Sequence, residues 1–267
     1  MKIDNYIRAD SPEAAFRLLN DDPKSMVLGG GLWLRLSDPD ISTLIGLELL
    51  ELDRIDEDEN WIKIGSQVTL RQLETSPALG KVASGILCQA AGMIMGVTVR
   101  NLATIGGSVC GRYGFSDLIT ALLALDARLV FFQEEEMSLK QFLGVKKPKR
   151  DLLLAIRIRK TPGNGYFRKV SITALDFALV NVAIARRAGK YKIVLGARPG
   201  IAMCANKAMS YLDDIDFPSL ENVQIATQIA LQEITFSTNA KATEAYRQKL
   251  ARVYLERGLK AVIGLEN

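Results

Sequence analysis

Two glycine-rich loops hold the residues of this sequence whose types and spacing could do chemistry. The first is Gly29-Gly30-Gly31, at the end of a short apolar run, and the second is the pair Gly106-Gly107. Glycine leaves the backbone N–H groups unencumbered, so a glycine loop after a strand can cradle a diphosphate. Tight turns without a ligand use the same residues, but two such loops in one α/β region favour an anion site.

The two best-known phosphate signatures are absent. A dinucleotide fingerprint that starts at Gly29 needs glycine or alanine where this chain has Leu34, and no Gly-Lys-Ser/Thr follows either loop. Any diphosphate bound here is therefore held by another kind of glycine loop.

The composition excludes several classes of chemistry. The chain of 267 residues has no histidine, which removes imidazole bases, His-dependent nucleophiles and His-ligated metals. Its three cysteines, Cys88, Cys110 and Cys204, are too few for an iron-sulfur cluster, which needs four thiolates. We therefore expect no metal site, and we expect free thiols in a reducing compartment, the cytoplasm.

Helical and strand patterns alternate through the first 160 residues, which favours a mixed α and β fold. Ser11 and Pro12 are typical of a helix start. A long uncharged stretch at 82–99 reads as a buried helix and loop rather than a membrane span, because it contains polar residues and glycines. Further helices are predicted at 69–74 and 121–125, and strands at 25–28, 61–65, 128–132 and 152–158.

Turn-forming residues at 160–165 predict a domain boundary. Beyond it we expect a helix at 174–187, a strand at 191–197 and helices containing 223–233 and 242–262. These elements predict a smaller α+β unit.

The charge pattern indicates no nucleic-acid partner. Lysine and arginine number 34 against 30 acidic residues, a net charge of +4. A basic run at 146–150 is interrupted by a proline and reads as a solvated loop. The N-terminus lacks the pattern of a signal peptide, in line with a cytoplasmic protein that does not span a membrane.

Longer motifs around both loops resemble those of a known family. Residues 26–34 (Met-Val-Leu-Gly-Gly-Gly-Leu-Trp-Leu) and 100–108 (Arg-Asn-Leu-Ala-Thr-Ile-Gly-Gly-Ser) are similar to the two FAD-diphosphate loops of the flavoprotein subunit of molybdenum hydroxylases. Asp117 and the run at 121–125 keep the family's order and spacing. The likeness continues at 167–171, 176–178, 195–197 and 245–247, and so covers nearly the whole chain.

This resemblance implies an α+β fold and a noncovalent FAD site. A PCMH-type FAD-binding domain at 1–160, with subdomains at about 1–50 and 51–160, would precede a C-terminal α+β flavoprotein domain at 165–267. The residues that it implies in cofactor binding are Leu28, Gly29, Gly30, Gly31, Leu32 and Trp33 of the first loop, Thr104, Gly106, Gly107 and Ser108 of the second loop, Asp117, Leu153 near the flavin, and Lys169 near the cofactor. Ile94 and Met95 match positions that touch the cofactor in relatives, although core packing explains them equally well.

The chain also departs from the family pattern. Gly31 and Leu32 stand where polar residues are common, Ser108 replaces the commoner asparagine, and no proline precedes Asp117. The backbone donors survive these changes, so we still expect FAD to bind.

The function implied is that of an electron-transfer subunit, with no catalytic acid or base on this chain. Electrons would come from the 2Fe-2S clusters of a small partner subunit, in a complex whose large subunit binds molybdopterin, and would leave through FAD to NAD+ or another acceptor. Two alternatives remain open: a structural subunit without FAD that bridges its partners, and a self-contained flavin oxidoreductase.

Overall fold

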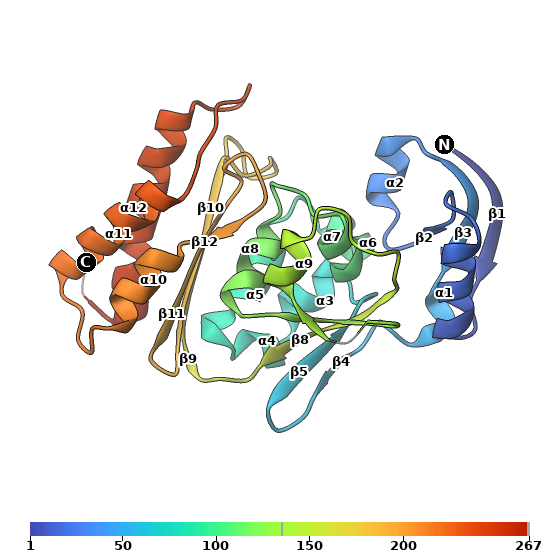
Figure 1. Ribbon diagram of the computed structural model, residues 1–267, viewed down its shortest axis with the longest axis horizontal. Helices are drawn as coiled ribbons and strands as arrows, with labels where there is room; N and C mark the ends of the chain where they lie inside the picture. The colour runs from blue at the N-terminus through green and yellow to red at the C-terminus, as the bar shows by residue number, and fades with distance from the viewer. Residues whose placement is uncertain (135, 266–267) are drawn as a thin grey trace.

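A computed structural model describes residues 1–134 and 136–265 of the chain. Three β-sheets lie in sequence order along the long axis of the molecule, each with its own helices (Figure 1). We call these parts the N-terminal unit (residues 1–50), the middle unit (51–160) and the C-terminal unit (163–265). The mixture of helix and sheet with a separate C-terminal part confirms the predicted fold class.

The N-terminal unit is a small parallel sheet with a helix packed on it. Its strands, in the order β1-β3-β2, are β1 (Lys2–Arg8), β3 (Asp40–Gly46) and β2 (Met26–Val27). Helix α1 (Pro12–Asp21) starts as predicted, with the Ser11 hydroxyl accepting from the N–H of Ala14. Helix α2 (Leu32–Ser37) follows the first glycine loop, and a 3-10 turn, η1 (Glu48–Leu50), leads into the middle unit.

The middle unit contains an antiparallel sheet and most of the short helices. Its strands lie in the order β4-β5-β8-β6-β7. They are β4 (Ile55–Glu57), β5 (Trp61–Gly65), β8 (Leu153–Arg159), β6 (Arg128–Phe131) and β7 (Met137–Ser138). The helices are α3 (Leu70–Thr75), α4 (Pro77–Gly80), η2 (Ala83–Gly85), α5 (Ile86–Gly92), α6 (Val97–Leu102), α7 (Ile105–Cys110), α8 (Asp117–Ala124) and α9 (Leu139–Gly144).

The long uncharged stretch at 82–99 is not one helix. It is divided among η2, α5 and the start of α6, and the left-handed backbone of Gly85 (φ 70°) and Met95 (φ 43°) separates the pieces. A residue with positive φ cannot continue a right-handed helix. Among the described residues, no helix combines the length and the apolar character needed to cross a membrane.

The C-terminal unit is an antiparallel sheet between two helical layers. Strands β9 (Gly163–Val170), β10 (Val180–Arg187), β11 (Lys190–Gly196) and β12 (Met203–Cys204) lie in the order β12-β11-β10-β9. Helices α10 (Asn206–Asp213), α11 (Leu220–Glu233) and α12 (Glu244–Ile263) cover one face, and α8 of the middle unit packs against the other (Figure 1).

One sequence prediction in this unit is wrong. The helix expected at 174–187 is strand β10, in which Val180, Val182 and Ile184 alternate with residues that face the middle unit. Because both faces of this strand are buried, it reads as a continuous apolar run, which a helix also produces. The turn expected at 160–165 is shorter, since Gly163 and Gly165 already pair with β10.

Candidate functional site

The first glycine loop connects β2 to α2. The N–H of Leu28 donates to the carbonyl of Ile45, which extends the pairing of β2 with β3, and the chain then turns through a left-handed Gly31 (φ 71°). A methyl group on Gly30 would lie 1.9 Å from the carbonyl oxygen of Leu102, at the end of α6. Glycine at position 30 therefore allows the first loop to lie directly against the second.

The second glycine loop is the start of α7. Thr104 caps this helix by accepting from the N–H of Gly107, and Gly106 donates its own N–H to the carbonyl of Ser66 at 2.9 Å. The hydroxyl of Ser108 donates to the carbonyl of Thr104 at 2.8 Å. The Ser108 hydrogen is thus used within α7, whereas the backbone of the exposed Gly107 faces open space.

A cavity of about 410 Å³, the larger cavity, opens on one side of the paired loops. Its wall includes a cluster of aromatic rings that are tilted against one another. The ring centroid of Trp33 lies 4.7 Å from that of Tyr113 and 5.6 Å from that of Phe115, and the centroids of Phe115 and Phe177 are 4.4 Å apart. Five of the predicted residues line it, Leu32, Trp33, Ser108, Asp117 and Lys169, together with Ile94 and Met95.

The charged groups of the larger cavity include a buried ion pair. The side chains of Asp117 and Lys169 are 6% and 5% exposed, and Lys169 Nζ lies 3.8 Å from Asp117 Oδ2. Lys169 also donates to the carbonyl of Met93 at 2.9 Å. Burial raises the pKa of Asp117 to about 6, against the opposing effects of the Asn181 amide and the lysine charge. Asp117 is therefore mostly ionised at neutral pH, but it becomes protonated in mild acid.

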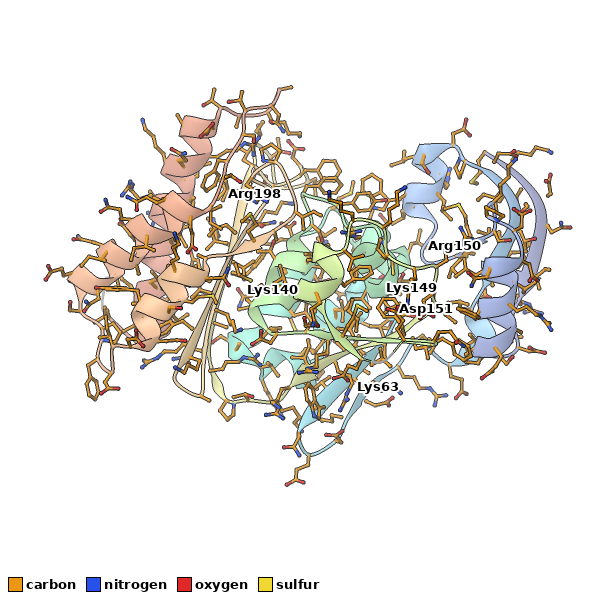
Figure 2. All side chains as sticks on the ribbon, in the orientation of Figure 1. Lys63, Lys140, Lys149, Arg150, Asp151 and Arg198 are labelled. Carbon is orange, nitrogen blue, oxygen red and sulfur yellow. The ribbon has the colours of Figure 1, made fainter. Side chains whose placement is uncertain are left out.

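A second cavity of about 320 Å³, the smaller cavity, lies on the other side of the loops, where the middle unit faces the N-terminal unit. Ser66 lines it and is 3% exposed, and its hydroxyl is a buried group without a hydrogen-bond partner within the described residues. Figure 2 shows Arg150 and Asp151 at this junction, between the middle unit and α1. Four of the predicted residues line the smaller cavity, Gly29, Gly106, Gly107 and Leu153.

The predicted residues are thus divided between two cavities. Leu153 and Lys169, both expected close to the cofactor, line different cavities. The remaining predicted residues, Leu28, Gly30, Gly31 and Thr104, line neither cavity. Two of them lie where the loops meet: Gly30 lies against Leu102, and Thr104 lies against Gly29.

Sequence reasoning did not predict some of the residues that shape the site. Tyr113, Phe115 and Phe177 complete the aromatic wall, and Ser66 and Gln67 line the smaller cavity. Tyr113 and Phe115 lie in the segment that departs from the family pattern, as Leu32 does in the first loop. That shared departure could have pointed to Tyr113 and Phe115, and the family motif at 176–178 could have pointed to Phe177.

Comparison with known proteins assigns the site to a class. Residues 1–160 match the family model described as the FAD binding domain in molybdopterin dehydrogenase, and residues 165–262 match the CO dehydrogenase flavoprotein C-terminal domain. Fold and family matches together define a flavoprotein subunit of the oxidoreductase class. More particularly, the chain belongs to the FAD-binding (medium) subunits of the molybdenum hydroxylases, and its cofactor is FAD. The predicted family and cofactor are confirmed.

Individual relatives share the full length of the chain. An uncharacterised Escherichia coli K12 protein, YgfM, is 29% identical over 254 residues, which cover 94% of this chain and 93% of YgfM. The putative xanthine dehydrogenase FAD-binding subunit XdhB of the same strain is 22% identical, with coverage of 97% and 96%. The carbon monoxide dehydrogenase of Hydrogenophaga pseudoflava contains a chain of the same fold, with a TM-score of 0.87, 22% identity and 98% coverage of both chains.

Proposed function

We propose that this chain is the FAD-carrying electron-transfer subunit of a molybdopterin-dependent dehydrogenase or hydroxylase complex. In this proposal it receives electrons from the 2Fe-2S clusters of a small partner subunit and passes them to NAD+ or another acceptor. The observation that carries the proposal is the pair of cavities that meet at two touching glycine loops in a chain of this family. When bound, FAD supplies the redox chemistry, and the protein supplies position and electrostatics.

The shape of the site fits FAD, which has a planar ring system at each end of a diphosphate-linked chain. We place the flavin end in the smaller cavity, beside Leu153, and the adenine end in the larger cavity, beside the aromatic wall and Lys169. The unpartnered hydroxyl of Ser66 supports this fit, because a buried hydroxyl without a partner costs free energy that a polar ligand edge would recover.

The diphosphate would lie between the cavities, over the exposed backbone of Gly107 and the start of α7. The first N–H groups of α7 already donate within the protein, to Val68, Ser66 and Thr104. We therefore assign the donors for the diphosphate oxygens to the backbone of Gly29-Gly30-Gly31 in the first loop. We assign Asp117 the role of accepting hydrogen bonds from hydroxyl groups of the cofactor, since an ionised carboxylate is an acceptor only. Lys169 holds that carboxylate and adds positive charge to the same wall.

The partners follow from what this chain lacks the residues to hold. Its three cysteines fall short of the four thiolates of a 2Fe-2S cluster, so the clusters belong to another subunit. The molybdopterin site is proposed on a large subunit, by analogy with the molybdopterin dehydrogenases that name the family model and with the Cu,Mo-CO dehydrogenase that contains a chain of the same fold. The three thiols are free, which suits a reducing, cytoplasmic setting.

Reconstitution tests the proposal. The purified chain, incubated with FAD and freed of excess, should be yellow and show a flavin absorption spectrum. A colourless protein that takes up no FAD would leave only the bridging role. Isolation from the native source should bring down a molybdenum subunit and an iron-sulfur subunit, whereas turnover by the isolated chain on a substrate of its own would favour a self-contained flavin oxidoreductase.

A further inference from the structure

A row of three residues crosses the C-terminal sheet directly behind Asp117. In the antiparallel register, Asn181 of β10 pairs with Lys169 of β9 on one side and with Gly196 of β11 on the other. Directly opposed residues of antiparallel strands point to the same face. This is the face on which α8 packs, so the row lies against Asp117 and Thr120 of that helix.

The hydrogen bonds of Asn181 run in a fixed direction. An ionised carboxylate only accepts, so the Asn181 amide nitrogen must point to Asp117, and it does so at 2.7 Å from Oδ1. The Asn181 carbonyl oxygen then faces Thr120, whose hydroxyl donates to it at 2.8 Å. Asn181 is fully buried, and so is Thr120. Two side chains therefore fix the orientation of one carboxylate.

Gly196 makes room for this arrangement. A methyl group at position 196 would lie 2.2 Å from the Thr120 hydroxyl and 2.3 Å from the Asn181 carbonyl oxygen. If position 181 served only to fill the core, an apolar residue would be sufficient there, as Ala183 and Ala185 are on the same face of β10. The Asn181 amide is buried, both its nitrogen and its oxygen are hydrogen-bonded, and Gly196 leaves the space that it needs. This arrangement indicates a functional role rather than packing alone.

We propose that Asn181 is a positioning residue of the FAD site: it holds the Asp117 carboxylate against Lys169 and facing the larger cavity, as the acceptor for hydroxyl groups of FAD. This inference rests on the proposed function, because Asp117 has that role only if FAD binds there. Neither the family resemblance nor the comparisons assign Asn181 or Thr120.

The charges around Asp117 set the direction of the expected effect. Burial raises its pKa to about 6, and the amide of Asn181 is the first of the groups that oppose this rise, followed by Lys169. Other titratable groups that line the same cavity are Arg35 of α2, Tyr113, and Asp176 in the segment between β9 and β10. Removal of the Asn181 amide therefore raises the pKa of Asp117 further, toward neutral pH.

The test is the pH dependence of FAD binding by the full chain, measured by difference absorbance between pH 5 and pH 8. A bond that needs the ionised carboxylate is lost as the pH falls, so wild-type affinity should drop below a midpoint near 6. In Asn181→Leu the midpoint should move up by about one pH unit, and the affinity at pH 8 should fall as well, because the ionised carboxylate is no longer held in place. Thr120→Val should move it in the same direction by less.

Matched controls separate positioning from folding. Val182→Ala removes buried volume from the opposite face of β10 and should keep the wild-type midpoint, even if it lowers stability. Carboxyl NMR of the FAD-free chain follows Asp117 itself and should show the same upward shift in Asn181→Leu. If that variant does not fold, Thr120→Val decides.

Each contrary result has one meaning. An unchanged midpoint in the variants, or an equal loss of affinity at every pH, overturns the role of Asn181 and leaves FAD binding intact. Wild-type FAD binding that does not change between pH 5 and pH 8 overturns it as well. Failure of the wild-type chain to bind FAD at any pH refutes the proposed function instead, and the NMR titration still reports whether Asn181 controls Asp117.

Discussion

The glycines of the two loops have different tasks, although they look equivalent in the sequence. Gly30 touches the backbone of the second loop, and Gly106 approaches the carbonyl of Ser66, where a methyl group would lie at 2.6 Å. At Gly107 the nearest contact of a methyl group would be the Thr104 hydroxyl at 3.2 Å. Of these three glycines, Gly107 is therefore the one that offers an exposed surface to a ligand without a backbone contact that needs glycine.

Alanine substitutions separate these two tasks. Gly107→Ala should change the free energy of unfolding by less than about 1 kcal/mol, because the higher helix propensity of alanine is offset by the close contact of its methyl group with the Thr104 hydroxyl. Its methyl group should weaken FAD binding by about tenfold or more, since it intrudes on the proposed diphosphate path. Gly30→Ala should instead lower the free energy of unfolding by about 2 kcal/mol through overpacking.

The measurements are urea denaturation and FAD titration. Gly144→Ala is the control, because a methyl group at the end of α9 meets nothing within 4 Å. Normal FAD affinity in Gly107→Ala would contradict the proposed path of the diphosphate.

At the scale of elements, a single arginine links the middle unit to the strand that leads into the first loop. The basic run at 146–150 was expected to be a solvated loop, yet the Arg150 guanidinium donates to backbone carbonyls at the end of α1 and just before β2 (Figure 2). The acceptors are the carbonyls of Leu19, Asp22, Pro23 and Ser25. Because β2 leads into Gly29, this contact helps to position the first glycine loop.

Loss of that link should loosen the N-terminal unit. Arg150→Met should lower the free energy of unfolding by about 1–3 kcal/mol, because charged hydrogen bonds to carbonyls are lost, and should speed proteolysis within residues 1–50. Arg150→Lys should rescue little, since one ammonium cannot span the acceptors of a planar guanidinium. Urea denaturation measures the free energy of unfolding, and limited proteolysis measures the rate of cleavage within residues 1–50. Lys147→Met, at an exposed position, is the control for both. Stability equal to that control would show that the link is dispensable.

At the scale of the whole molecule, the aromatic wall joins all three units. Trp33 comes from α2, Tyr113 and Phe115 from the segment before α8, and Phe177 from the segment between β9 and β10. Trp33 is 37% exposed in the larger cavity. A planar ligand that enters this cavity therefore contacts residues far apart in the sequence.

Tryptophan fluorescence should report that contact. The chain has two tryptophans, and Trp61 lies in β5 beneath the guanidinium groups of Arg157 and Arg159, outside both cavities. In Trp61→Phe the emission comes from Trp33 alone, and we expect FAD to quench it strongly as the flavin absorbance of the bound cofactor rises. In Trp33→Phe, the emission of Trp61 should be quenched less, because Trp61 lines neither cavity. Flavin uptake with no change in Trp33 emission would place FAD outside the larger cavity.

The sequence by itself determined the family, the cofactor and the fold class, because these depend on local motifs. Loop glycines, the Ser11-Pro12 helix start and the Arg-Asn-x-Ala-Thr-Ile-Gly-Gly-Ser motif each act over a few residues, and their spacing is visible without coordinates. The strand at 180–187 was not predicted, because both of its faces are buried and the sequence lacks the alternation of polar and apolar residues that identifies a strand.

The tertiary structure alone decided how the predicted residues are shared between two cavities, and which further residues join them. Leu153 and Lys169 are 16 positions apart yet line different cavities, while Asp117 meets Asn181, 64 positions away, through sheet register and the packing of α8. Register and packing depend on contacts between distant segments. No spacing along the chain encodes them, because each is fixed only when the three units pack together.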